Sequence, residues 1–106
     1  MRLVFVDATR GGVPVPKGAK AVTLADLLAN GLADGDALLV YAPAPGWDGE
    51  AALVGLLASS DARAIVVRAE RADGFTPDPL AAASTGLIAG FGQAGLAEAV
   101  AFLKKR

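Results

Sequence analysis

The C-terminal part of the chain holds its most restrictive feature, a run at residues 79–97 without a single charged residue. Alanines, leucines and spaced glycines in this run predict a long helix over residues 80–104 that is apolar on every side. Such a helix has to be covered by its own domain, by a partner or by a membrane, because a surface helix keeps a polar face. A chain of 106 residues has little core to spare, which favours a partner.

Small residues recur every four positions along this predicted helix, and larger apolar residues occupy an adjacent face. We expect this surface to contact a second subunit, with packing on the chain's own sheet as the alternative. The predicted interface consists of Gly86, Leu87, Gly90, Phe91, Ala94 and Phe102. A membrane span is not expected, since Gln93, Glu98 and the glycines make a poor lipid-facing segment.

Three short apolar runs, at residues 3–6, 37–42 and 64–67, are typical of strands buried on both faces of a parallel sheet. Residues 9–18 are rich in glycine and proline, and they predict a loop with an extended edge. The chain therefore alternates strands with segments that have to cross over the sheet.

Helix signals lie between these runs. Residues 23–26 resemble a capping box, in which the Thr23 hydroxyl accepts from a backbone amide and Asp26 reaches back. The helix that they open should stop near residues 31–35, where glycines recur. Asp48 is the predicted N-cap of the next helix, which finishes at residues 59–61. The pattern predicts one α/β domain over residues 1–106, a small three-layer Rossmann-like domain with a short, mainly parallel sheet and a long C-terminal helix.

Composition argues against several kinds of chemistry. The chain has no histidine and no cysteine, which removes the commonest general base, the thiolate nucleophile and the usual metal ligands. Its net charge is -1 and its basic residues are scattered except at the end of the chain, residues 104–106, so no nucleic-acid partner is expected. These features favour a non-catalytic protein without metal or cofactor. The N-terminus lacks a signal-peptide pattern, and we expect a cytoplasmic location.

The alternative function is a small-molecule or nucleotide-binding module, or an enzyme, with its site at the carboxyl edge of the sheet. Asp7 follows the first strand at the edge where open α/β sheets bind ligands, although aspartate also caps turns. Arg10, Gly11 and Gly12 come next and offer backbone amides and a cation to an anion. Trp47 is predicted in a loop at the same edge, as a ligand anchor or as a core contact.

Residues 39–43, 64–67 and 81–91 follow one another in an order that resembles a short-chain dehydrogenase/reductase. In that family the last of these segments opens a helix with Tyr-x-x-x-Lys. Ala81 and Thr85 stand at the positions of the tyrosine and the lysine, so the resemblance implies a degenerate member without the catalytic pair.

The same resemblance bears on the cofactor and on assembly. Arg68 and Ala69 fall near the position of the family's catalytic serine, and residues 7–12 lack the Gly-x-x-x-Gly-x-Gly spacing of its dinucleotide loop. The family's corresponding helix packs against its counterpart in a neighbouring subunit. The resemblance thus implies a homodimer, or a partner subunit of an enzyme, that binds no cofactor.

Overall fold

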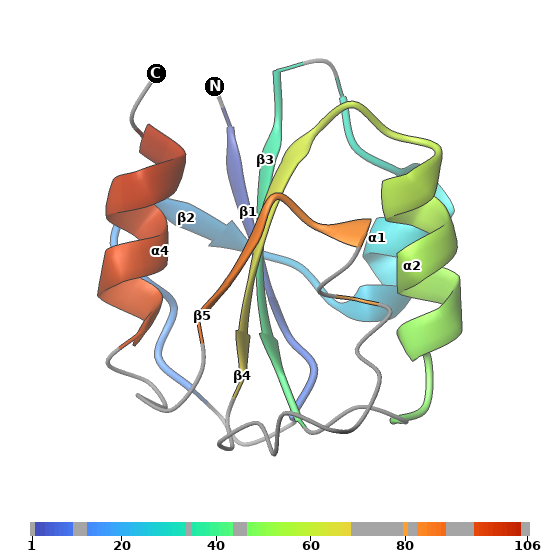
Figure 1. The fold of residues 1–106 in the computed structure, drawn as a ribbon, viewed down its shortest axis with the longest axis horizontal. Helices are drawn as coiled ribbons and strands as arrows, with labels where there is room; N and C mark the ends of the chain where they lie inside the picture. The colour runs from blue at the N-terminus through green and yellow to red at the C-terminus, as the bar shows by residue number, and fades with distance from the viewer. Residues whose placement is uncertain are drawn as a thin grey trace.

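Five parallel strands form one sheet in the order β2-β1-β3-β4-β5, with helices on both of its faces (Figure 1). The computed structural model describes residues 2–9, 13–33, 35–43, 47–68, 80, 83–88 and 95–104. The strands are β1 (Leu3–Asp7), β2 (Ala19–Ala21), β3 (Ala37–Ala42), β4 (Arg63–Arg68) and β5 (Gly86–Ile88). The helices are α1 (Leu24–Asn30), α2 (Glu50–Ala58) and α4 (Gly95–Lys104). The predicted three-layer, Rossmann-like α/β fold is confirmed.

The central strands lie where continuous apolar runs predicted them. Strand β3 matches its predicted bounds and is buried at all six positions, as a strand covered on both faces must be. Strand β1 extends one residue beyond its predicted run, to Asp7. Strand β4 extends one residue beyond its predicted run at each end, to Arg63 and to Arg68. Charged residues therefore mark the ends of strands whose middles are apolar.

Two separate cores lie on the two faces of the sheet. On one face, α1 and α2 contribute Leu27, Leu53 and Leu57 to a cluster with the side chains of the central strands. On the other face, α4 contributes Leu96 and Leu103 to a second cluster. Figure 1 shows the sheet edge-on between these layers.

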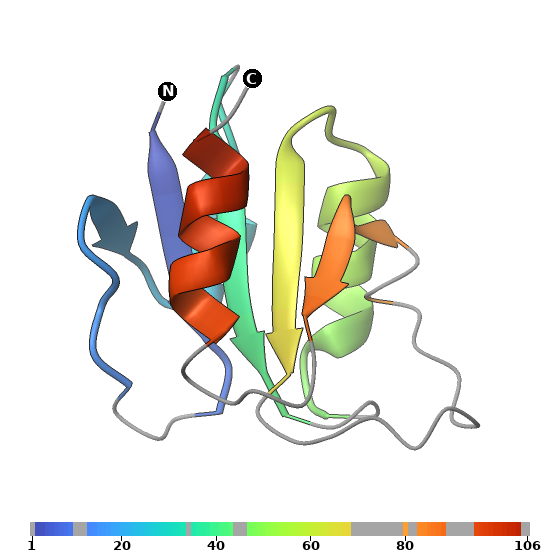
Figure 2. The same cartoon turned by 60° about the vertical axis from the view of Figure 1, so that its left-hand side comes forward.

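The connection between β1 and β2 runs over the α4 face, whereas α1 and α2 connect the later strands across the opposite face (Figure 2). Val13, from the first connection, belongs to the same core cluster as Leu96 of α4. The chain therefore changes faces between the crossover that follows β1 and the one that follows β3. This change of direction determines where the candidate site lies.

The ends of α1 agree with the sequence signals. The Thr23 hydroxyl accepts a hydrogen bond from the Asp26 amide at 3.1 Å, and Gly31 ends the helix with a positive φ of 69°. For α2 the predicted cap was wrong: Gly49 precedes the helix with φ 89° and no side-chain cap, and Asp48 lies one residue further out.

The long helix predicted over residues 80–104 was wrong. Gly86 and Leu87 lie in strand β5, where Gly86 pairs with Ile65 of β4, and α4 begins only at Gly95. A short strand at the edge of the sheet needs no charge, so the uncharged run does not require a helix that is apolar all round. Alanine- and glycine-rich runs of this kind do not distinguish strand from helix by periodicity.

Consequently the predicted stripe of small residues does not form one helix face. Gly86 is in β5, while Gly90, Phe91 and Ala94 lie outside the described residues. Phe102 is on α4 and 45% exposed.

Within the described part of the chain, no helix has both the length and the apolar character needed to cross a bilayer.

Candidate functional site

A crevice forms at the carboxyl edge of the sheet, where the connections after β1 and β3 diverge to opposite faces. Asp7 pairs with Tyr41 at this edge, and the Ala8 amide donates a hydrogen bond to the Tyr41 carbonyl at 2.8 Å. The chain after β1 then turns toward α4, and the chain after β3 turns toward α2. In open α/β sheets, ligands bind in crevices formed by this change of direction.

Asp7 organises the chain that follows β1. Its Oδ1 accepts hydrogen bonds from the amide and the hydroxyl of Thr9, and its Oδ2 accepts one from the Val13 amide at 3.2 Å. The turn-capping role weighed for this residue is therefore present. The carboxylate thus bonds to described residues on both sides of positions 10–12, while the predicted candidates Arg10, Gly11 and Gly12 themselves lie outside the described part of the chain.

A pocket of about 410 Å³ lies beside this carboxylate and brings together the two residues predicted at the edge, Asp7 and Trp47. It lies where the short strand β2 stops at Ala21 while β1 continues to Asp7. We call it the carboxyl-edge pocket. Its lining comprises Phe5, Asp7, Ala8, Val13, Val15, Ala21, Val22, Thr23, Leu24, Ala25, Trp47 and Asp48.

The chemistry of the pocket combines one large aromatic side chain with negative charge. Asp7 and Asp48 are the charged residues among those described in its lining, and most of the others are apolar. Trp47 is partly buried and packs against the core on the α1 and α2 side. Its indole Nε1 is buried and has no hydrogen-bond partner among the described residues.

Gly49 allows Trp47 to pack beside α1. The backbone at Gly49 has φ 89°, and a Cβ there would stand 2.6 Å from Leu24 Cδ2 and 3.3 Å from Trp47 Cζ3. The conformation therefore favours glycine, since other residues rarely adopt this φ, and a Cβ would in addition force the ends of the Leu24 and Trp47 side chains to shift. The tryptophan thus has a defined place in the wall of the pocket.

Sequence reasoning missed a buried charged pair that holds the loop carrying Trp47. The Arg68 guanidinium, at the end of β4, donates from Nη1 to the Pro43 carbonyl and lies 3.6 Å from Glu50 Oε2 through Nη2. Pro43 and Glu50 stand at the two ends of the connection from β3 to α2. One arginine, 1% exposed, therefore ties both ends of this connection to the sheet.

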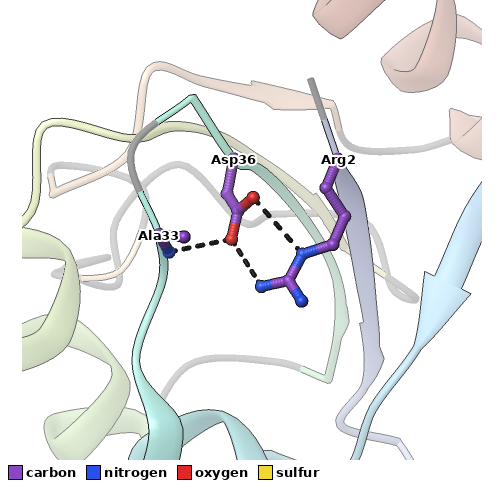
Figure 3. Close-up of polar contacts among 3 residues, drawn as sticks. All are labelled: Arg2, Ala33 and Asp36. Atoms are coloured by element: carbon purple, nitrogen blue, oxygen red, sulfur yellow. Dashed lines mark hydrogen bonds and ion pairs between the residues drawn. The ribbon is translucent and has the colours of Figure 1, made fainter.

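A second charged pair lies at the opposite, amino edge of the sheet (Figure 3). Arg2 donates to Asp36 from Nε at 3.3 Å and from Nη2 at 2.6 Å, and the Ala33 amide donates to Asp36 Oδ2 at 2.8 Å. The hydrogen bond from Arg2 lowers the pKa of Asp36 below its usual value. These contacts join the start of β1 to the turn before β3, far from the crevice.

Thr85, which the reductase resemblance aligned with a helical lysine, lies in the bend before β5. Its hydroxyl accepts a hydrogen bond from the Ala64 amide at 3.0 Å, and its amide donates to the Ala64 carbonyl at 2.7 Å. These bonds give Thr85 a structural role at the edge of the sheet.

In the described part of the chain, no group of three or more acidic side chains is placed to hold a metal ion.

Comparison with models of protein families, with curated proteins and with solved structures finds no match to this chain.

Proposed function

We propose that this protein binds a small organic molecule in the carboxyl-edge pocket. The observation that carries the proposal is the meeting of Asp7 and Trp47, from loops that leave neighbouring strands in opposite directions, in one pocket of about 410 Å³. That volume falls within the range of roughly 300–1,000 Å³ typical of ligand pockets. The position agrees with the general rule for ligands of open α/β sheets.

The lining favours a neutral or cationic ligand with a flat apolar face and hydroxyl or amino donors. The indole of Trp47 offers a surface for stacking or for a cation, and carboxylates accept hydrogen bonds from hydroxyl and amino groups. A phosphate would meet the negative charges of Asp7 and Asp48. We therefore favour a nucleoside-like ligand over a nucleotide. Because the chain has no histidine and no cysteine, we also favour binding without catalysis.

The supports of the pocket walls strengthen this proposal. Asp7 holds the loop after β1 through Thr9 and Val13, and Arg68 holds the loop that carries Trp47. A site whose side chains are fixed before binding loses less conformational entropy when the ligand arrives.

The fluorescence of Trp47, the single tryptophan of the chain, provides the test. Adenosine and AMP form a suitable pair of probes because they share a flat base and hydroxyl groups and differ by a phosphate. We expect adenosine to quench or shift the emission of Trp47 at lower concentration than AMP does. Preference for AMP, or no response to either probe, would contradict the proposed ligand class.

A matched pair of variants locates the binding. Ala25 and Ala29 are both exposed on α1, but only Ala25 lines the pocket. Ala25→Leu should weaken adenosine binding by about tenfold or more, whereas Ala29→Leu should leave it unchanged. Equal effects of the two substitutions would place the binding elsewhere.

A second candidate function is self-association, or pairing with an enzyme, through α4. What supports it is the exposure of Phe102, which is 45% accessible although the Arg63 guanidinium lies 5.3 Å from the centre of its ring. The resemblance to reductases also implies contact with a second subunit. The proposed location is the cytoplasm. Light scattering should then give a dimer mass that falls in Phe102→Ser and persists in Leu28→Ser, a control at an exposed leucine of α1. A monomeric wild type would exclude the homodimer.

A further inference from the structure

An open groove runs along one side of α4, on the face of the sheet away from α1 and α2. Its two walls are α4, through residues between Leu96 and Lys104, and the segment at residues 13–18, which is neither helix nor strand. Its volume is about 580 Å³. We call it the α4 groove.

The groove lies where a crossover helix is missing. The connections from β2 to β3 and from β3 to β4 contain α1 and α2, whereas the described residues between β1 and β2 (8–9 and 13–18) include none in a helix. In doubly wound domains, helices cover both faces of the sheet. Here one side of α4 has the irregular segment 13–18 as its neighbour in place of a second helix.

Apolar side chains remain uncovered in the groove. Val15 is 47% exposed, and Val100 of α4 is only partly buried although it packs against the core. Pro14 and Ala97, which also line the groove, are exposed. Burying these surfaces would be favourable for any partner that matches their shape.

Positive charge is concentrated at the amino-edge end of the groove. Lys17 and Lys104 are the charged residues among those described in its lining. The Nζ atom of Lys104 lies 2.9 Å from the position that a Cβ would occupy at Gly18, so its ammonium group reaches from α4 to the opposite wall. An occupant therefore meets an apolar surface first and two ammonium groups at the end.

The dimensions suit a helix. From Leu96 to Lys104 the wall formed by α4 spans about 12 Å at 1.5 Å per residue, which is about two helical turns. Apolar residues at positions i, i+3, i+4 and i+7 of a docked helix cover the same length. We infer that the α4 groove binds an amphipathic helix of a partner protein, whose apolar face covers Val15 and Val100 and whose acidic residues pair with Lys17 and Lys104.

The test uses two synthetic helices of about four turns, each labelled with fluorescein. Both carry leucines at i, i+3, i+4 and i+7, and they differ in having glutamates or lysines at the end that would face Lys17 and Lys104. Fluorescence anisotropy should show that wild-type protein binds the glutamate peptide about tenfold or more tightly than the lysine peptide. In the double variant Lys17→Glu and Lys104→Glu, this preference should reverse.

A matched pair of substitutions on α4 localises the contact. Ala97 and Ala101 are both exposed, but only Ala97 lines the groove. Ala97→Glu should weaken binding of the glutamate peptide by about tenfold or more, and Ala101→Glu should leave it unchanged. The emission of Trp47 should stay the same in both variants, which shows that the fold and the carboxyl-edge pocket are intact.

Three results would overturn the inference. The first is equal affinity for the two peptides, or no binding of either. The second is an equal effect of Ala97→Glu and Ala101→Glu, because the peptide would then lie outside the groove. The third is a wild-type dimer whose mass falls in Ala97→Glu but not in Ala101→Glu, because a second copy of the chain would then occupy the groove.

Discussion

Arg68 and Glu50 face each other at the carboxyl edge of the sheet, with Arg68 Nη2 3.6 Å from Glu50 Oε2. Both side chains are almost completely buried, and Arg68 also donates to the Pro43 carbonyl. The pair thus joins the end of β4 to both ends of the connection that carries Trp47. A buried ion pair of this kind does not by itself imply a large gain in stability, but removal of one partner is costly.

Arg68→Met should therefore lower the free energy of unfolding by about 3–5 kcal/mol, because the buried Glu50 carboxylate loses its ion pair with the guanidinium. Urea denaturation followed by circular dichroism measures the loss. The double variant Arg68→Met and Glu50→Gln should recover part of it. A loss well below ~1 kcal/mol in the single variant would contradict the role assigned to this pair.

Local sequence signals identified much of the fold. Strand β3 could be predicted to the residue because all six of its side chains are buried, and such a strand appears in the sequence as an unbroken apolar run. Helix α1 could be predicted because Thr23 and Gly31 carry the chemistry of its two ends. The region after residue 79 could not, because a short edge strand and a helix joined by small uncharged residues resemble one long helix.

The candidate site was only partly accessible from the sequence. Asp7 and Trp47 were both predicted at the carboxyl edge, since each follows a recognisable strand. Their meeting in one pocket depends on the paths of two loops to opposite faces of the sheet. Arg68 and Glu50 gave no local signal, because the contact between a strand end and a helix start is set by tertiary packing.

The Arg2–Asp36 pair predicts a specific dependence of stability on pH. The pKa of Asp36 is lower in the folded protein than in the unfolded chain, where it is about 3.9, because Arg2 donates to the charged carboxylate. Its contribution is therefore complete above this value and is lost as pH falls through the lower folded pKa. Urea midpoints between pH 7 and pH 2 should fall less steeply in Asp36→Asn than in wild type. Parallel curves would contradict the pairing.

Gly49 and Gly35 allow backbone strain to be separated from steric clash. Both have a positive φ, 89° and 83°, but a Cβ at Gly49 would clash with Leu24, whereas a Cβ at Gly35 would meet nothing within 4 Å. Gly35→Ala should cost about 1–2 kcal/mol, the penalty for the left-handed conformation. Gly49→Ala should cost more and shift the emission of Trp47. Equal losses of stability would mean that Leu24 and Trp47 move aside freely.

The Asp7 carboxylate accepts hydrogen bonds from two residues, Thr9 and Val13, and substitutions can remove either all of these bonds or the one from the Thr9 hydroxyl. Asp7→Ala takes the acceptors from the amides of Thr9 and Val13 and from the Thr9 hydroxyl, so the free energy of unfolding should fall by about 2–3 kcal/mol. Thr9→Val removes the hydroxyl alone and should cost about 1 kcal/mol. Chemical denaturation gives both values, and acrylamide quenching of Trp47 reports on the pocket. If the two variants lose the same stability, the amide bonds to Asp7 contribute little, and the loop after β1 is held by the packing of Val13 in the core.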